Sequence, residues 1–233
     1  MAQLHPVVRL VDYERLVKRR RLRVKGPLVL EEKLDGYLLV VYNGAFYTGL
    51  GRRAPNWILR ALAGAGADPL PASRNRLLYI EVYGRCLSPG GFHRNDKRCY
   101  RAALVDAARP PAYAGNIEEA VLLSRTLDPL ERRGIAEDTG LEHPRGAVIT
   151  VDSAPRAWML LELLEGFQDR EGYVLKLYSI HGHVLPPDYG AKIRGLLEVK
   201  VKHSYRGLFA GIRATPLYSK GSRHPLQFRG KLC

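Results

Sequence analysis

Short apolar runs rich in Val, Ile, Leu and Tyr recur along the chain, and several alternate apolar with polar positions. This period of two is typical of half-buried β-strands. The runs lie at residues 28–30, 37–42, 45–48, 77–83, 101–106, 147–151, 172–178 and 196–202. Between the second and third runs, Asn43-Gly44 predicts a tight hairpin, because both residues accept the positive φ of a type I′ turn.

Helical patterns lie between these runs. Residues 55–65 begin with a proline and place apolar side chains on one face. Asn116 and Ser153 each precede a further apolar pattern, where a helix N-cap is expected. This irregular order of strands and helices predicts an α+β fold with mainly antiparallel sheets flanked by helices, in a single domain over residues 1–233.

The chain is basic, with 37 Lys and Arg against 23 Asp and Glu and a formal net charge of +14. Such a charge attracts polyanions, among them nucleic acid, nucleotides and acidic membrane surfaces. An arginine-rich chain with two methionines is also typical of proteins from hot environments, so charge does not choose among these. The hydrophobic content of 46% excludes the disordered class, because it supports a real core.

The cysteines argue against a stapled or zinc-bound protein. Cys86, Cys99 and Cys233 are odd in number and lack zinc-knuckle or CxxC spacing, so we expect neither a disulfide framework nor a structural metal. A reducing compartment follows from that expectation. The N-terminal residues lack the apolar core of a signal peptide and no run approaches 18 apolar residues, so a cytoplasmic protein without a membrane span is predicted.

Charged residues within strand-like runs are the candidate chemical groups. Lys33 and Asp35 in KLDG lie two residues apart ahead of the hairpin, so an extended segment would turn amine and carboxylate to one side. By itself this pattern also fits a surface lysine before a turn. Further candidates follow in the runs downstream: Glu81, Asp106, Glu171, Lys176, Lys200 and Lys202. Each run alone fits the solvent face of a strand, but the order of the whole set is harder to obtain by chance.

The ordered segments are KLDG (33–36), YIEVYG (79–84), LVDA (104–107), EGYVLK (171–176) and EVKVK (198–202). Their series resembles the motifs of the covalent nucleotidyltransferase superfamily, which comprises ATP-dependent DNA ligases, RNA ligases and messenger-RNA capping enzymes. The resemblance spans residues 28–202. Tyrosine after KLDG, the IEVYG form and the short spacing are more similar to RNA ligases. The resemblance implies the ligase nucleotidyltransferase fold, which is similar to ATP-grasp. It also implies that the activity is that of an ATP-dependent RNA ligase.

The resemblance implies that Lys33 attacks the α-phosphate of ATP and forms a covalent lysyl-AMP intermediate. The attacking amine must be neutral, whereas an ordinary lysine is charged at pH 7. Lys200, Lys202, a divalent cation and partial desolvation would all favour a neutral amine. The same cations would stabilise negative charge as pyrophosphate leaves. The catalytic group implied in this way is Lys33, Asp35, Lys200 and Lys202.

Roles for the remaining residues are also implied by the resemblance. Asp35, Glu81 and Glu171 would approach Mg²⁺ or Mn²⁺, which prefer oxygen ligands. Adenine would lie between Val105 and Val174, although Val105 stands where RNA ligases usually carry an aromatic residue. Backbone groups beside Glu32 would then add to adenine discrimination. The nucleotide-binding set implied is Glu32, Lys33, Arg52, Glu81, Val105, Glu171, Val174, Lys176, Lys200 and Lys202, with Arg53 as the alternative to Arg52.

A ligase of this superfamily also holds nucleic acid, transferring AMP to a 5′-phosphate before a 3′-hydroxyl displaces it. KRRRLRVK (18–25) and a second group, Arg94, Lys97, Arg98 and Arg101, are candidate phosphate contacts, although each also fits a solvated surface. His181 and His183 are too close for a usual zinc pair. Residues 203–233 form a short C-terminal extension, too small for the usual OB domain. We therefore expect either a minimal ligase built from the catalytic domain alone or a catalytic domain that relies on a homodimer or a partner protein for the later steps.

Three other functions fit parts of the pattern. An ATP-dependent DNA ligase shares every motif and differs in the sugar at the nick. A capping guanylyltransferase shares the lysine chemistry but uses GTP. A basic nucleic-acid-binding protein that merely retains the fold would bind RNA or DNA with a steep salt dependence and form no covalent adduct.

Overall fold

The structure is a computed structural model that describes residues 4, 7–19, 22, 24, 26–88, 91–92, 99–178, 196–209 and 227–228. The chain divides into two compact units. Unit 1 consists of Met1–Pro6, Leu34–Pro144 and Gly190–Arg194, and unit 2 of Val7–Lys33, Arg145–Tyr189 and Gly195–Cys233. Each unit is therefore assembled from segments far apart in the sequence, and a single domain over 1–233 stays a prediction.

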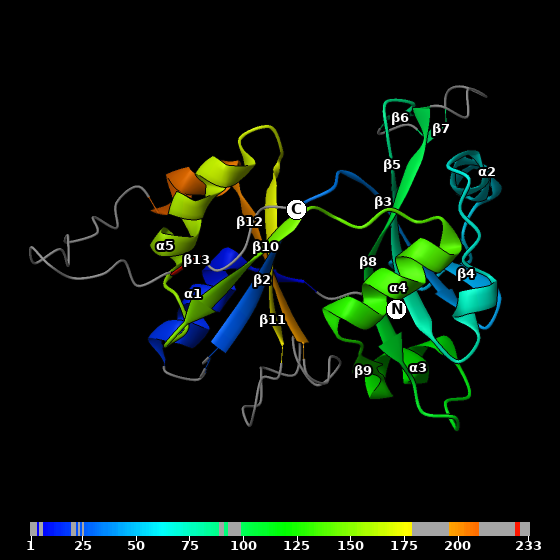
Figure 1. Ribbon diagram of the computed structural model, residues 1–233, viewed down its shortest axis with the longest axis horizontal. Coiled ribbons are helices and arrows are strands. Elements are labelled where there is room, and N and C mark those ends of the chain that lie inside the picture. Colours follow the sequence, from blue (N-terminus) through cyan, green and yellow to red (C-terminus); the bar gives the residue numbers. More distant parts are fainter. Residues whose placement is uncertain are drawn as a thin grey trace, which may run out of the picture. The chain divides into compact units, whose positions relative to one another are not determined.

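Unit 1 is built on a five-stranded antiparallel sheet (Figure 1). Its strands, in spatial order, are β4 (Ala45–Thr48), β3 (Gly36–Tyr42), β5 (Leu77–Tyr83), β8 (Arg101–Arg109) and β9 (Arg125–Thr126). Asn43 and Gly44 connect β3 to β4 with φ angles of 46° and 76°, which confirms the predicted hairpin. A two-stranded sheet of β6 (Leu87–Ser88) and β7 (Gly91–Phe92) follows β5.

Helices cover both faces of this sheet. The helical segments are α2 (Asn56–Gly64), η1 (Pro71–Ser73), α3 (Ile117–Leu123) and α4 (Pro129–Thr139). Apolar side chains of α2 and α4 share one core with the sheet, and those of α3 share a second core on the opposite face. The side chain of Asn116 accepts a hydrogen bond from the amide of Glu119 at 2.9 Å, so the predicted cap of α3 is confirmed.

Unit 2 contains a six-stranded mixed sheet (Figure 1). Its spatial order is β1 (Val8–Arg9), β12 (Leu196–Lys202), β11 (Gly172–Tyr178), β2 (Gly26–Glu32), β10 (Gly146–Val151) and β13 (Gln227–Phe228). The β1–β12 pair is parallel, and the other pairs are antiparallel. The helical segments of this unit are α1 (Leu10–Lys18), α5 (Ala157–Glu162), η3 (Leu163–Phe167) and η4 (His203–Phe209).

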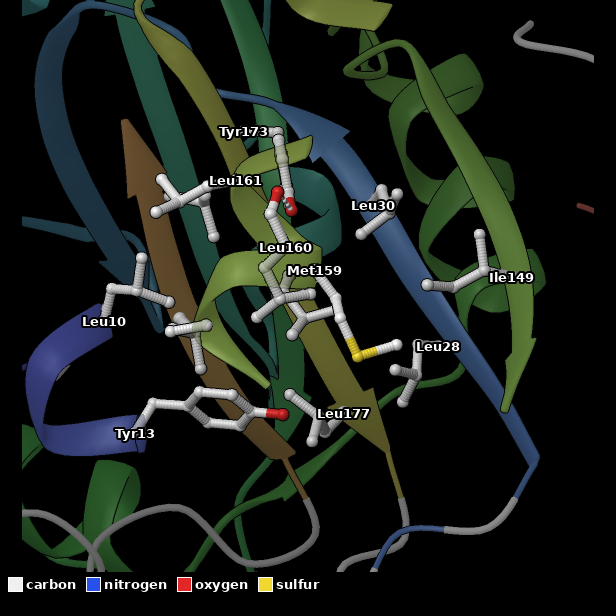
Figure 2. Packing of buried hydrophobic residues seen from close by; sticks show 14 of the residues in the cluster. Leu10, Tyr13, Leu28, Leu30, Ile149, Met159, Leu160, Leu161, Tyr173 and Leu177 are labelled. Atoms are coloured by element: carbon white, nitrogen blue, oxygen red, sulfur yellow. Dashed lines mark hydrogen bonds between the residues drawn. The ribbon is translucent and has the colours of Figure 1, made fainter. Parts of the chain in front are cut away.

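The core of unit 2 lies between one sheet face and the helices α1 and α5 (Figure 2). Leu28, Leu30 and Leu177 from the sheet pack with Tyr13 and Leu160 from the helices. The Tyr13 hydroxyl donates a hydrogen bond to the Pro155 carbonyl at 2.8 Å. Burial raises the pKa of Tyr13, which keeps its hydroxyl protonated and able to donate.

Helix α5 begins later than the sequence pattern suggested. Its N-cap position is Arg156, not Ser153. The reason is a carboxylate from α1: Glu14 accepts the amide of Ala157 at 2.8 Å and the Nε of Arg156 at 2.7 Å. A side chain 142 residues away therefore caps this helix, and a local reading cannot identify it.

Cys86 and Cys99 form a disulfide, so the expectation that these cysteines are unpaired is wrong. Strands β5 and β8 are antiparallel neighbours with Tyr83 opposite Arg101. That pairing brings the ends of the intervening segment together and leaves the two cysteine Cα atoms 5.6 Å apart. The inference of a reducing compartment rested on these cysteines and loses that support.

No helix among the described residues has the length and apolar character to cross a membrane.

Candidate active site

One face of the sheet in unit 2 carries two of the four predicted catalytic residues, Lys200 and Lys202. Tyr173, Leu175 and Leu177 of β11 belong to the core, as do the odd-numbered residues 197, 199 and 201 of β12. Because side chains alternate along a strand, the even-numbered positions project from the opposite face. We call this opposite face the charged face; its residues are Glu31, Val174, Lys176, Glu198, Lys200 and Lys202.

Strand register aligns the charged face into cross-strand rows. Val174 lies opposite Lys200 on one side and opposite Glu31 on the other. Gly172 lies opposite Lys202, and its carbonyl accepts the amide hydrogen of Lys33 at 3.0 Å. The two lysines therefore flank one glycine, although they are 169 positions apart in the chain.

Gly172 is required by this close approach. A Cβ atom at this position would lie 2.0 Å from the carbonyl oxygen of Val201 and 2.9 Å from the Cα of Lys202. Both neighbours are backbone atoms, which cannot rotate away. The glycine of EGYVLK thus allows β11 and β12 to pair at the row that carries Lys202.

Glu171 lies between the two flanking lysines. Lys33 Nζ donates a hydrogen bond to its Oε2 atom, and Lys202 Nζ donates one to its Oε1 atom. The exposed fractions of the three side chains are 13% for Lys33, 26% for Lys202 and 34% for Glu171. Burial alone would raise the pKa of Glu171, but hydrogen bonds from Lys202 and Lys33 and their charges bring it below its ordinary value. Two ammonium groups are therefore directed at one ionised oxyanion, an arrangement that also suits a phosphate.

Lys176 lies deeper on the charged face. Its Nζ atom is 3.0 Å from Glu31 and 3.1 Å from Glu198, and the three side chains are 2%, 3% and 1% exposed. One buried ammonium thus contacts two buried carboxylates, as buried charges require. A nucleotide contact by Lys176 stays a prediction.

Glu32 secures the end of the strand that precedes Lys33. Its carboxylate accepts the amide of Arg145 at 3.0 Å and lies 3.3 Å and 3.0 Å from the Nε atoms of Arg145 and Arg170. Its own amide donates to the Arg145 carbonyl at 2.8 Å. Arg145 and Arg170 were not identified from the sequence, because each lies outside the motifs and meets Glu32 only in the folded chain.

Unit 1 carries the other predicted carboxylates. Asp35 is exposed, directly before Gly36, where a Cβ atom would lie 2.2 Å from the carbonyl oxygen of Val82. That glycine lets β3 begin against β5. Glu81 lies in β5 opposite Leu38 and Ala103, on the same sheet face as Tyr79. The boundary between the units follows Lys33, so Lys33 and Asp35 are described with different units.

The other nucleotide contacts predicted in unit 1 lie on β8 and on the turn after β4. Val105 is partly buried at an irregularity in the β5–β8 pairing, on the same sheet face as Tyr79. Arg52 is exposed, and its carbonyl accepts the amide of Thr48 at 2.7 Å. Arg53 lies over the ring of Tyr47 with its Cζ atom 5.0 Å from the centroid. The guanidinium of Arg53 is thus stacked on an aromatic ring.

The predicted site residues divide between the units as follows: Asp35, Arg52, Glu81 and Val105 in unit 1, and Glu32, Lys33, Glu171, Val174, Lys176, Lys200 and Lys202 in unit 2. In the described part of the chain, no group of three or more His, Cys, Asp or Glu is placed to hold a metal ion. Mg²⁺ commonly binds through one or two carboxylates, waters and substrate phosphates, so the individual carboxylates still fit such an ion.

The basic patches fall largely outside the described residues. Arg94, Lys97, Arg98, His181 and His183 lie outside them, as do residues 20, 21, 23 and 25 of KRRRLRVK. Arg101 is described, and its guanidinium donates two hydrogen bonds to Glu142 at 2.7 Å and 2.6 Å. It also lies over the ring of Tyr83. A phosphate contact by Arg101 would have to compete with that carboxylate.

Comparison with known proteins identifies similar folds. No family model matches the chain, and no curated protein matches its sequence. An archaeal ATP-dependent RNA ligase is 16% identical with a TM-score of 0.54, over 91% of this chain and 53% of its own. A mutant of Naegleria gruberi RNA ligase with ATP and Mn is 14% identical with a TM-score of 0.55, over 89% and 58%. An Aquifex aeolicus protein assigned to the ATP-dependent DNA ligases is 17% identical with a TM-score of 0.52, over 88% and 50%.

This chain spans about half the length of these solved structures. Identities of 14–17% speak to the fold alone. At that level the expectation from the sequence is confirmed: the chain is α+β and shares its architecture with these proteins.

Proposed function

We propose, from the nucleotidyltransferase fold of this chain, that it is an ATP-dependent polynucleotide ligase that forms lysyl-AMP at Lys33 and acts on RNA. The observation that carries the proposal is the pair of lysines, Lys33 and Lys202, that flank Gly172 and contact Glu171. A structural surface lysine has no need of a second lysine and a glycine row to place it. A nucleophile that attacks a phosphate gains from a neighbouring cation, which stabilises the negative charge on the phosphate oxygens.

The first step is attack of Lys33 Nζ on the α-phosphorus of ATP. A nitrogen–phosphorus bond forms, the bond from the α-phosphorus to the bridging oxygen breaks, and pyrophosphate leaves with that electron pair. The ammonium gives up one proton to become the neutral nucleophile and a second as the nitrogen–phosphorus bond forms, both to solvent, so the product nitrogen keeps one hydrogen. Lys202 and Lys200, on the charged face, stabilise negative charge on the phosphate oxygens.

Glu171 has to release Lys33 before the attack. While the carboxylate contacts both lysines, it occupies the position that suits a phosphate oxygen. An entering nucleotide phosphate would compete for Lys202 and leave the Lys33 amine directed at the phosphorus. The released carboxylate would then be available to a hydrated cation.

Mg²⁺ or Mn²⁺ would be held by oxygens of Asp35, Glu81 and Glu171 and would neutralise phosphate charge when bound. The adenine contacts proposed are Val105 and Val174. Val174 is partly buried and lies next to Lys200 across the strands, so a base on Val174 has its phosphates near a lysine. Arg52, Glu32 and Lys176 complete the proposed nucleotide-binding set.

Sealing follows when AMP passes to a 5′-phosphate and a 3′-hydroxyl displaces it. RNA is proposed over DNA because a tyrosine, Tyr37, follows KLDG, as in the RNA ligases that the motif resembles. In this structure Tyr37 contacts Trp57 edge-on, with ring centroids 4.8 Å apart. A homodimer or a partner protein is proposed to take part in sealing. A cytoplasmic location stays part of this proposal.

The test is intact-protein mass spectrometry after incubation with ATP and Mg²⁺. Wild type should gain one AMP, Lys33→Ala should gain none, and Lys202→Ala should gain AMP more slowly. Arg133→Ala is the control, because Arg133 is a cation on α4 that is 65% exposed and belongs to neither the motifs nor the two basic patches. A folded wild type, stripped of bound nucleotide, that gains no adduct with ATP, GTP or NAD would overturn the enzymatic function.

Nicked duplexes that differ in the sugar at the nick separate the two ligase functions. Faster sealing of the RNA nick supports the proposal, and faster sealing of the DNA nick favours the neighbouring function. Binding without any adduct would indicate a nucleic-acid-binding protein that retains the fold.

A further inference from the structure

Arg132 is a buried arginine outside every motif. It lies on α4 with 1% of its surface exposed. Burying a guanidinium carries a large desolvation cost, which the hydrogen bonds of its Nη1 and Nη2 atoms help to offset. The groups that receive those donors therefore indicate what the arginine is for.

One donor reaches the strand that carries Val105. Arg132 Nη1 donates a hydrogen bond to the Val105 carbonyl at 2.5 Å. At this point the register between β5 and β8 shifts: Tyr79 pairs with Asp106, whereas Ile80 pairs with Leu104. Val105 is therefore the extra residue of a β-bulge, and such a residue needs a partner from outside the regular ladder.

The bulge changes which side chains the strand presents. Leu104 and Ala107 face the core shared with α2 and α4, whereas Val105 packs with the core on the opposite face. Asp106 lies opposite Tyr79, which faces that same second core. Two consecutive residues are thus turned to one face, the face that carries Glu81.

The outer edge of β8 explains why an arginine is used here. Next to Ala103 the edge pairs with the segment at Glu142, and at Ala108 it pairs with β9. Val105 lies between these two stretches. The guanidinium of Arg132 enters at this point and bonds the Val105 carbonyl, where a strand would otherwise supply the donor.

A second donor ties the guanidinium in place. Arg132 Nη2 is 3.2 Å from His143 Nε2, and His143 Nδ1 is 3.0 Å from the Pro144 carbonyl. Because arginine only donates, Nε2 must accept, so the proton of the neutral ring is on Nδ1 and is donated to Pro144. The arrangement joins α4, the bulge of β8 and the segment at His143.

We infer that Arg132 is a positioning residue for nucleotide binding: its bond to the Val105 carbonyl holds the bulge that presents Val105 to the adenine. This inference rests on the proposed function in one respect, the role of Val105 as a base contact. Arg132 itself does not touch the nucleotide. Its removal should therefore weaken adenine binding through Val105 and leave the lysine chemistry of unit 2 in place.

The experiment measures ADP binding by calorimetry in wild type, Arg132→Met, Val105→Ala and the double variant. Each single change should weaken binding about tenfold, the effect of one lost positioning bond or contact. The double variant should bind ADP no more weakly than the single variant with the lower ADP affinity, because both changes act through the Val105 side chain. Arg132→Lys, which keeps a donor, should recover part of the affinity.

Ile135→Ala is the matched control, because it removes buried apolar contact from the same helix without touching Val105. It should lower the unfolding temperature and leave ADP affinity within about twofold of wild type. Hydrogen exchange supplies a second measurement: residues 104–107 should exchange faster in Arg132→Met than in Ile135→Ala. If Arg132→Met does not fold, Arg132→Lys serves in both measurements.

The positioning role would be overturned if the losses of ADP affinity added up in the double variant. It would also be overturned if Ile135→Ala lost as much ADP affinity as Arg132→Met. Failure of the proposed function is seen separately, as absence of the AMP adduct in wild type that still binds ADP. A wild type that binds no adenine nucleotide would overturn both.

Discussion

Glu171 is the residue whose ionisation most directly reports the state of the candidate site. Its carboxylate accepts hydrogen bonds from Lys202 and Lys33, and its pKa is below the ordinary value of 4.5. Between the folded and unfolded pKa values, the unfolded chain binds more protons than the folded chain. The stability contributed by this carboxylate is therefore present above pH 4.5 and is lost as the pH falls through the folded pKa.

Glu171→Gln should reveal this dependence. At pH 7 the free energy of unfolding of the variant should be lower than that of wild type by about 1 kcal/mol. The effect is small because Glu171 and its two lysine partners are partly exposed, and solvent screens their charges. The difference should shrink as the pH falls below the ordinary value of 4.5, because wild type then loses the same charge. Urea unfolding from neutral to acidic pH measures it, with Glu165→Gln, at an exposed position of η3, as the control. If the difference in unfolding free energy between wild type and Glu171→Gln stayed constant as the pH fell, the result would contradict the ionic contacts of Glu171 with Lys33 and Lys202.

At the scale of elements, the pairing of β11 with β12 determines where Lys202 lies. The row that carries this lysine can form only if position 172 has no side chain, because the nearest backbone oxygen would be 2.0 Å from a Cβ atom. The carbonyl of Gly172 also accepts the amide hydrogen of Lys33. One glycine therefore controls the spacing of the two lysines.

Gly172→Ala should shift β12 away from β11. We expect a loss of about 2 kcal/mol or more in unfolding free energy and an AMP-adduct rate about a hundredfold lower, because small displacements of reacting groups are costly. Gly166→Ala is the control in the same unit, since a Cβ atom there has nothing within 4 Å. Rapid adduct formation by a stably folded Gly172→Ala would show that the row does not position the lysines.

The disulfide between Cys86 and Cys99 joins the end of β5 to the start of β8 with a sequence separation of 13. A cross-link over a loop of that length restricts the unfolded chain and contributes about 3 kcal/mol at most. Cys86→Ser with Cys99→Ser should lower the unfolding midpoint, and reductant should bring wild type to the same value. Reductant added to the double variant should change nothing. An unchanged wild-type midpoint in reductant would indicate that the bond adds no stability.

At the scale of the whole molecule, the net charge of +14 should govern the binding of nucleic acid. Lys and Arg that neutralise phosphates release counterions, so affinity falls as salt rises. We expect binding of a nicked RNA duplex to weaken by at least about tenfold between roughly 50 and 200 mM salt. Fluorescence anisotropy measures this, and binding of uncharged adenosine is the control that should change little. A flat salt response would exclude phosphate contacts as the main source of affinity.

Local features were predictable because their causes are local. The Asn43-Gly44 hairpin depends on two residues that tolerate positive φ, and the cap of α3 depends on Asn116 and an amide three residues later. Alternation within 172–178 and 196–202 likewise predicted both strands. The order of the motifs predicted the fold in a different way, through the resemblance to a known superfamily.

Contacts between distant segments were decided only by the tertiary structure. The cap of α5 comes from Glu14, the cysteines meet because β5 pairs with β8, and Lys176 is buried by two carboxylates from other strands. In each case the partner's identity depends on which strands or helices lie side by side, and residue spacing carries no such information. The sequence by itself therefore determined the elements, the hairpin and the candidate nucleophile. The tertiary structure decided that Lys33 and Lys202 meet at Glu171, because strand register, not distance along the chain, brings them to one glycine.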